Sequence, residues 1–220
     1  MFLRIGDPKL PQYSTGGGDG GGTDDGSEDG GGNGDDCSKP TFNGDAKIIL
    51  SQNFPDPSFV FDFEDCTWYS FGSQDKGKLV QIARFNKAKD EWELLNDDPL
   101  KGAGSRGQDL DIVSPDVQWN GEHWVMYHSA FTQDDHDGKR CIGVAFSDSI
   151  RGPYEPRDEP LACHFDRGGA IDPSAFYDPG SDTRWVVYKI DGNRICGKTS
   201  IMLQQVSQVP DLLVSSHLYR

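Results

Sequence analysis

Apolar residues from about residue 53 onward fall in short extended runs that are separated by polar turns. Helical periodicity of useful length is missing almost everywhere, and only the stretch after Lys198 is ambiguous. The segment VQWNGEHWVMYHSAF, residues 117–131, has an Asn-Gly pair between two extended runs, which predicts a β-hairpin. The segment CIGVAFSDSIRGPYEP, residues 141–156, supplies a third strand. The pattern therefore predicts an all-β domain.

A pattern of three features recurs about every 57 residues. In each copy an aspartate stands beside a proline, an extended run follows, and a second strand reads Trp-x-x-aromatic after a polar turn. The aspartates are Asp56, Asp116 and Asp172, at intervals of 60 and 56 residues; the second-strand pairs are Trp68/Phe71, Trp124/Tyr127 and Trp185/Tyr188. About four short strands per unit predict the radially repeated sheets of a β-propeller. A β-sandwich is the alternative, but it does not need aspartates in register with the repeat.

The same register gives a hypothesis for function. The first strand of each propeller blade lines the central channel, so the three aspartates would point into one funnel. Like charges at close range raise one another's pKa values, which lets an acid and a base coexist near neutral pH. Pro55 and Pro57 flank Asp56 and predict a stiff, extended backbone there. The structural alternative is that Asp-Pro marks a turn and that the carboxylates bind nearby backbone N–H groups.

Composition divides the chain into segments. Residues 16–36 hold eleven glycines and seven acids with no apolar side chain, so this stretch cannot offset its ordering entropy. It carries seven of the net fifteen negative charges and leaves about minus eight on the rest. We therefore expect a disordered N-terminal segment over 1–43, a partial propeller domain over 44–206 and a separate tail over 207–220.

Composition also excludes several classes of partner. The acidic balance, with no visible basic patch, argues against nucleic acid. No apolar run approaches the ~18 residues that span a bilayer, and the first ten residues do not form a secretory signal. The five cysteines are widely spaced without a Cys-x-x-Cys pair, so a zinc site is not expected. They permit either two disulfides and a free thiol, or five buried thiols. We expect no metal and no cofactor.

Three stretches together resemble a known family: FPDPSFV; SPDV with YHSAF; and GGAIDPSAFYD with WVVYKIDGN. They are similar to the glycoside hydrolases of family 43, the arabinanases, α-L-arabinofuranosidases and β-xylosidases with a five-bladed propeller. The resemblance covers roughly residues 44–206. The combination of Pro-Asp-Pro-Ser with Ala-Ile-Asp-Pro-Ser about 115 residues later is specific, whereas either half alone is weak. It implies a secreted monomer that acts on an oligo- or polysaccharide, although this chain shows no signal peptide.

The resemblance also implies roles for individual residues. Asp56 matches the general base that activates water, and Asp172 matches the aspartate that modulates the pKa of the general acid. Asp116 matches a position near the substrate and is carried over as a binding contact. The family inverts the anomeric centre, because two carboxyl groups ~6.5 to 9.5 Å apart leave room for a water molecule.

The general acid of the family is a glutamate in a fourth blade, and here the sequence departs from the pattern. No glutamate follows Glu159. About 176 residues at ~57 per unit make three blades, whereas the fold needs five to close. We therefore expect a truncated or mis-spliced product whose reading frame leaves the family near Gln205 to Val209. Loss of the proton donor would remove roughly 10²- to 10⁴-fold of the rate.

Two further residues are candidate substrate contacts. Trp119 lies close to Asp116 in the sequence and is a candidate for stacking on sugars, whereas the tryptophans of the second strands are expected to pack in the core. His128 follows a strand and can reach the site, although a lone histidine in a β-protein is more often a structural neighbour. The loop TQDDHDGKR, residues 132–140, fails the EF-hand spacing and is expected to be a solvated hairpin tip.

The sequence thus predicts a propeller-type glycoside hydrolase for arabinan, arabinoxylan or xylan. Two other hypotheses stay open at this point. One is a carbohydrate-binding remnant without turnover, and the other is a retaining propeller enzyme similar to invertases and levansucrases, in which the first aspartate is a nucleophile.

Overall fold

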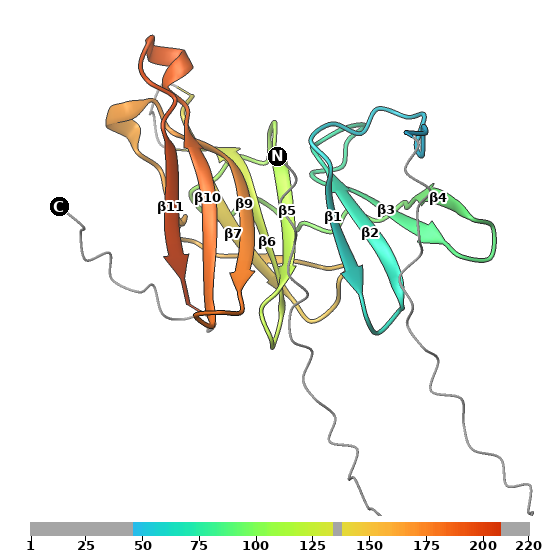
Figure 1. Ribbon diagram of the computed structural model, residues 1–220. Helices are drawn as coiled ribbons and strands as arrows, with labels where there is room; N and C mark the ends of the chain where they lie inside the picture. Colours follow the sequence, from blue (N-terminus) through green and yellow to red (C-terminus); the bar gives the residue numbers. More distant parts are fainter. Residues whose placement is uncertain (1–45, 134–137, 208–220) are drawn as a thin grey trace, which may run out of the picture.

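The computed structural model describes residues 46–133 and 138–207 of the 220-residue chain. Within these ranges the chain forms eleven β-strands and two short 3-10 helices, η1 (Phe165–Arg167) and η2 (Gly192–Ile195), and no α-helix (Figure 1). The all-β class predicted from the sequence is confirmed. The expected disordered segment 1–43 and nearly all of the expected tail lie outside the described residues.

The strands form three antiparallel sheets that follow one another along the chain. The first holds β1 (Ser58–Asp62), β2 (Thr67–Gly72), β3 (Gln81–Asn86) and β4 (Glu91–Leu94). The second holds β5 (Val113–Trp119), β6 (Trp124–Phe131), β7 (Arg140–Ser147) and β8 (Glu155–Pro156). The third holds β9 (Ala170–Asp178), β10 (Thr183–Ile190) and β11 (Ile201–Val206). Since β5 contacts both β1 and β9, the first strands of the three sheets lie beside one another (Figure 1).

The hairpin predicted at Asn120-Gly121 is confirmed. The Asn120 side-chain oxygen accepts hydrogen bonds from the backbone N–H groups of Glu122 and His123, at 2.9 and 2.7 Å. Gly121 has a φ of 105°, which a residue with a Cβ adopts only under strain. This turn fixes the pairing of β5 with β6, and so decides which β6 residues face each neighbouring sheet.

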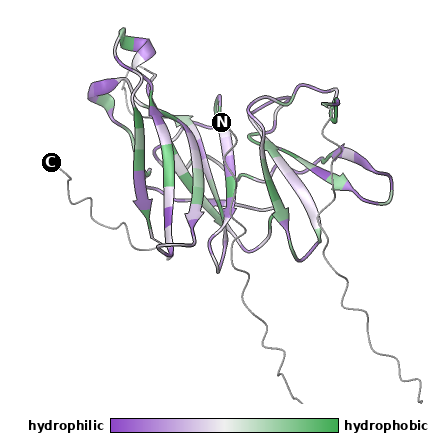
Figure 2. Ribbon diagram, in the orientation of Figure 1, coloured by the Kyte–Doolittle hydropathy of each residue, from purple (hydrophilic) through white to green (hydrophobic). Residues whose placement is uncertain are grey.

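The core lies between the sheets, and the alternation of β6 shows how it is built. Met126 points toward the first sheet, whereas Val125 and Tyr127 point toward the third. Burying one such side chain contributes about 1.5–3 kcal/mol. Figure 2 shows hydrophobic segments along the strands and mainly hydrophilic connecting loops. The largest fully buried hydrophobic side chains are Tyr69, Tyr154, Phe71, Ile82, Ile112, Met126, Ile142 and Ile190.

The outer faces of the first and third sheets are exposed. Phe59 is equivalent in register to Val117, which is buried between the first two sheets, yet Phe59 is 46% exposed. Phe176 is likewise equivalent to Val60, which packs on the core between the first two sheets, yet Phe176 is 45% exposed. Both phenylalanines are exposed because no sheet of the described residues packs against these two faces.

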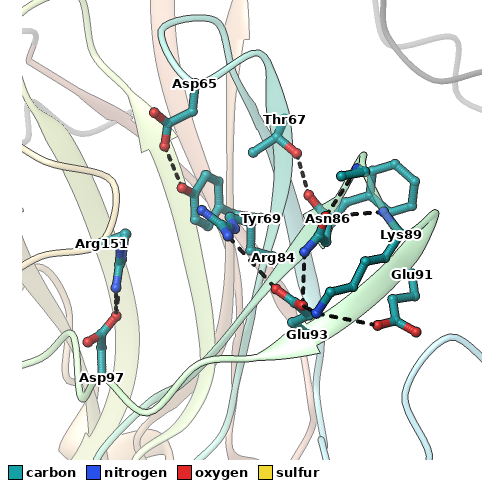
Figure 3. A network of polar contacts seen from close by, with 12 residues as sticks. Asp65, Thr67, Tyr69, Arg84, Asn86, Lys89, Glu91, Glu93, Asp97 and Arg151 are labelled. Atoms are coloured by element: carbon teal, nitrogen blue, oxygen red, sulfur yellow. Dashed lines mark hydrogen bonds and ion pairs between the residues drawn. The ribbon is translucent and has the colours of Figure 1, made fainter.

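The outer strands of the first sheet carry a network of polar contacts (Figure 3). The Lys89 ammonium lies 2.6 Å from Glu93, which also accepts a 2.9 Å hydrogen bond from Asn86. Arg84 lies 3.8 Å from the second carboxylate oxygen of Glu93. Exposed ion pairs of this kind are screened by solvent and contribute little to stability. Because Arg84, Asn86 and Lys89 all contact Glu93 of β4, the network links the two strands of the β3–β4 hairpin.

The cysteines match the first of the two arrangements that the sequence permits. Cys141 and Cys163 form a disulfide, Cys66 is also disulfide-bonded, and Cys196 is an exposed free thiol. Among the residues described, no helix is long and apolar enough to cross a membrane.

Candidate active site

The register of the three sheets identifies which residues of the repeat are equivalent. The matching cross-strand pairs are Ser58–Phe71, Asp116–Tyr127 and Ser174–Val187. Two residues before the first member of each pair stand Asp56, Ser114 and Asp172, each followed by proline and separated by 58 residues (56 to 114, 114 to 172). The prediction that Asp116 shares this position is therefore wrong. Asp116 aligns with Ser58 and Ser174, and Ser114 takes the place between the two aspartates.

The three pre-proline residues also share an unusual backbone conformation. Asp56, Ser114 and Asp172 have φ values of 51°, 52° and 60°. The left-handed region is strained for residues with a Cβ, at about 1–3 kcal/mol each. The extended conformation predicted for Asp56 is wrong, because tertiary hydrogen bonds override the local preference. The Ser73 N–H donates to the Pro55 carbonyl at 2.9 Å, and the Ser73 hydroxyl donates to Asp56 Oδ2 at 2.5 Å.

A chain of hydrogen bonds joins Asp56 to Asp172 through two serines. The Ser73 hydroxyl that donates to Asp56 also accepts the backbone N–H of Ser114 at 2.9 Å. The Ser114 hydroxyl donates in turn to Asp172 Oδ1, also at 2.9 Å. Ser73 is buried and Ser114 half-buried, whereas both aspartates are exposed. The structure thus brings the two predicted catalytic aspartates into one site, at the starts of β1 and β9, the first strands on either side of β5 (Figure 1).

The two carboxylates differ in how they are held. Asp172 Oδ1 accepts from Ser114, and Asp172 Oδ2 lies 3.0 Å from the Lys189 ammonium. The Asp172 N–H also donates to the Ser129 hydroxyl at 3.0 Å. Asp56, by contrast, has its Oδ2 engaged by Ser73, and its Oδ1 has no hydrogen-bond partner among the described residues. Asp56 therefore has an oxygen that can accept a proton from a water molecule, whereas Asp172 is a fixed negative charge.

Asp116 lies in a different environment. It is 8% exposed, and its Oδ2 accepts the Ala175 N–H at 2.7 Å, so the carboxylate joins the second sheet to the third. Burial raises the pKa of Asp116 to about 6, and the Ala175 hydrogen bond opposes that rise. The binding role carried over to Asp116 requires an accessible carboxylate, whereas this one is enclosed between two sheets.

Trp119 lies at the opposite end of β5 from Ser114. Ser114 and Trp119 are five positions apart, and at a rise of ~3.3 Å per residue this is about 16 Å along the strand. Trp119 is 44% exposed at the Asn120 turn, and its ring packs against Trp124 with centroids 5.3 Å apart. The structure therefore does not bring Trp119 together with Asp56 and Asp172.

His128 is fully buried on the face of β6 that points toward the first sheet. Its ring lies over Gly143, where a Cβ would come within 2.4 Å of Nε2, so a side chain at 143 would displace the ring. Neither ring nitrogen has a hydrogen-bond partner in the described part of the chain. Burial lowers the pKa of His128 to about 4, which keeps the ring neutral at pH 7. The structure places His128 in the core, out of reach of a substrate in the site.

Sequence reasoning missed three residues of this site: Ser73, Ser114 and Lys189. A signal for Ser114 exists, because a residue before proline recurs at equal intervals of 58. Within residues 46–133 and 138–207, no group of three or more His, Cys, Asp or Glu side chains is arranged to hold a metal ion. The side chains that the described site brings together are two carboxylates, a lysine ammonium and two hydroxyls.

Comparison with protein families identifies the chain. The model of glycosyl hydrolases family 43 matches residues 46–217, well over half of the sequence. The chain belongs to glycosyl hydrolases family 43. The match extends past residue 206, the predicted end of the resemblance. A comparison with curated proteins gives no match.

Solved structures of the family share the fold of this member. A thermostable family-43 glycoside hydrolase has a TM-score of 0.56 at 23% identity, covering 70% of this chain and 48% of that one. An endo-arabinase from Bacteroides thetaiotaomicron VPI-5482 has a TM-score of 0.59 at 17% identity, with 73% and 53% covered. An exo-1,5-α-L-arabinanase from a bovine ruminal metagenomic library has a TM-score of 0.50 at 17% identity, with 72% and 55% covered.

These likenesses establish the fold. The three sheets are blades of a family-43 β-propeller of the five-bladed type, as the sequence predicts. The chain spans about half the length of the solved structures it matches.

Proposed function

We propose that this family-43 member hydrolyses O-glycosyl bonds of plant cell-wall polysaccharides of the arabinan, arabinoxylan or xylan type, with inversion at the anomeric centre. Asp56 acts as the general base and Asp172 as the fixed carboxylate that orients the sugar and tunes the acid. Membership of the glycosyl hydrolases supports the reaction class. The names of the endo-arabinase and the exo-arabinanase of similar fold motivate the choice of arabinan-type substrates.

The roles are assigned from the number of carboxylate oxygens that are already engaged, which is one in Asp56 and two in Asp172. A general base needs an oxygen that can take a proton from water. Asp56 has such an oxygen, while both oxygens of Asp172 are engaged, by Ser114 and Lys189. A fixed anion beside the sugar also favours the positive charge of an oxocarbenium-ion-like transition state.

The direct test is hydrolysis of linear 1,5-α-L-arabino-oligosaccharides and xylo-oligosaccharides, with the first anomer read by ¹H NMR before mutarotation. The proposal expects the inverted anomer first. The retained anomer would contradict it, since Asp56 would then act as a nucleophile.

Binding without turnover is a second candidate, favoured by the side chains of the described site, which are two carboxylates, a lysine and two hydroxyls, with no third carboxyl group among them. Aryl glycosides with a dinitrophenolate leaving group separate the two, because such a leaving group departs without protonation. Cleavage of the aryl arabinofuranoside or xyloside that Asp56→Asn abolishes supports a working base. Calorimetric binding of the oligosaccharides with no cleavage of either substrate type, undiminished in Asp56→Asn, supports the binding function instead.

We also propose an extracellular location. The Cys141–Cys163 disulfide supports it, because disulfides persist in oxidising compartments and are rare in the cytosol. Mass spectrometry of the protein from its native source, alkylated without reduction, checks this. Alkylation of both cysteines would contradict it.

A further inference from the structure

The second strand of each sheet contributes one side chain at a position equivalent to Ser73. Counting two residues beyond the matched pairs gives Ser73, Ser129 and Lys189. The two serine hydroxyls make equivalent hydrogen bonds. Ser73 Oγ accepts the N–H of Ser114 at 2.9 Å, and Ser129 Oγ accepts the N–H of Asp172 at 3.0 Å. Each serine thus joins its own sheet to the pre-proline residue of the next sheet.

Lys189 breaks this repeat. A lysine ammonium has three donors and no acceptor, so it cannot accept a backbone N–H as the two serines do. It contacts the pre-proline residue of its own sheet, as Ser73 does with Asp56, and its Nζ lies 3.0 Å from Asp172 Oδ2. The side chains of Lys189 and Asp172 are 29% and 46% exposed, so the pair lies at the surface where a substrate can reach it.

The contact is more constrained than a single surface ion pair. Asp172 is held from two directions, by the Ser114 hydroxyl on Oδ1 and by Lys189 on Oδ2, while its N–H is fixed by Ser129. Two contacts on the carboxylate and one on the backbone N–H therefore restrict this residue, whose backbone is already strained. A cation beside Asp172 also reduces the repulsion between Asp172 and Asp56 when both are ionised.

We propose that Lys189 is a positioning residue of the active site, which holds the Asp172 carboxylate in one orientation during turnover. The effect on rate rests on the proposed function. The contact itself does not.

The kinetic test compares three variants at this position on the arabino- and xylo-oligosaccharides. Lys189→Met keeps the length of the side chain and removes the charge, and we expect kcat to fall about 10- to 100-fold with KM little changed. Lys189→Arg restores a cationic donor and is expected to recover most of the rate. Lys189→Ser makes the position match Ser73 and Ser129, and is expected to be as slow as the methionine variant.

The matched control is Lys101→Met, which removes the exposed ion pair of Lys101 with Glu155 in another part of the molecule. It is expected to keep the wild-type rate. Thermal unfolding of every variant shows whether the fold is retained. A folded Lys189→Met or Lys189→Ser protein with wild-type kcat would overturn the proposal, as would an equal loss in Lys101→Met.

A second readout is independent of turnover. The ¹⁵N shift of the Lys189 ammonium, followed by NMR, is expected to move in Asp172→Asn and to stay unchanged in Asp90→Asn, an exposed aspartate with a φ of 53° on the β3–β4 hairpin. No change in Asp172→Asn would overturn the contact and the proposal. If the shift moves but the wild-type protein cleaves neither oligosaccharides nor aryl glycosides, the proposed function fails and the positioning of Asp172 by Lys189 stands.

Discussion

Asp56 and Asp116 both stand beside a proline at the start of a first strand, yet the molecule uses them in opposite ways. Asp56 is exposed, has a φ of 51°, and accepts a hydrogen bond from the Ser73 hydroxyl. Asp116 is 8% exposed, does not have a positive φ, and accepts a hydrogen bond from the Ala175 N–H of the next sheet. The first is arranged for chemistry, whereas the second joins two sheets.

The order of the two residues explains the difference. Asp56 lies between two prolines and so precedes Pro57, whereas Asp116 only follows Pro115. The residue before proline is sterically restricted, so holding it at positive φ requires surrounding contacts that over-determine it. The residue after proline has no such restriction and continues the strand, and at Asp116 the side chain faces the third sheet, where it is buried. An Asp-Pro pair and a Pro-Asp pair are therefore different signals, even at the same place in a repeat.

The largest expected effect is that of Asp56→Asn on catalysis. Asparagine keeps the size of the side chain but cannot accept a proton from water, so kcat is expected to fall by about 10²- to 10⁴-fold. Initial rates on the arabino- and xylo-oligosaccharides measure this. Asp90→Asn is the matched control, since Asp90 is another exposed aspartate at positive φ. A rate in Asp56→Asn equal to that of the control would remove Asp56 from the chemistry.

The dependence of stability on pH is the next largest effect and belongs to Asp116. Its pKa is raised by burial from 3.8 to about 6, so between these values the folded protein retains a proton that the unfolded chain has released. Stability from this group is therefore present below about pH 4 and falls as the pH rises to about 6, by up to about 3 kcal/mol. Urea unfolding across this window is expected to show a shallower decline with rising pH in Asp116→Asn than in wild type. Identical slopes would mean that Asp116 is not buried as described.

Truncation of Asp116 tests whether its hydrogen bond to the Ala175 N–H stabilises the fold. Asp116→Ala leaves the buried Ala175 N–H without an acceptor, and we expect a loss of about 1–3 kcal/mol in the free energy of unfolding. Asp116→Asn keeps an oxygen in the same place and should be clearly more stable than the alanine variant at pH 7. Both are expected to retain wild-type kcat where folded. Equal stability of the two variants would contradict the role of this hydrogen bond.

The smallest effect concerns Ser114, the residue that aligns with the two aspartates. Ser114→Gly relieves the strain of a φ of 52° but loses the hydrogen bond to Asp172, so its stability should stay within about 1 kcal/mol of wild type. Ser114→Ala loses the bond without that relief and should be less stable than the glycine variant. Both should lower kcat, because Asp172 loses one of its contacts. A fully active glycine variant would show that the hydroxyl has no positioning role.

Much of the fold could be predicted from the sequence, because it depends on local signals. The alternation of β6 and the Asn120-Gly121 turn set a hairpin by themselves, and the repeated strands set the propeller. The conformation of Asp56 could not be predicted from the sequence. A residue before proline prefers an extended backbone, and only the contacts of Ser73, which is distant in sequence, reverse that preference.

The candidate site was found only in part for a similar reason. A search for one residue type at a shared interval aligns Asp116 with Asp56 and Asp172, and so overlooks Ser114. Lys189 was missed because its role depends on cross-strand register, which bulges in β5 and β9 shift by a residue. Burial of the ring removes His128 from the site, and Trp119 is removed by its place at the other end of β5.

Locating a bound sugar by NMR tests most directly whether Asp56 and Asp172 form the active site. Backbone amide shifts of the ¹⁵N-labelled protein are followed while arabinotriose, and separately xylotriose, is added. We expect the largest changes at Asp56, Ser114, Asp172 and Lys189, at the starts of β1, β5 and β9 and on the neighbouring end of β10. Changes centred on Trp119 and the Asn120 turn, at the other end of β5, would contradict it.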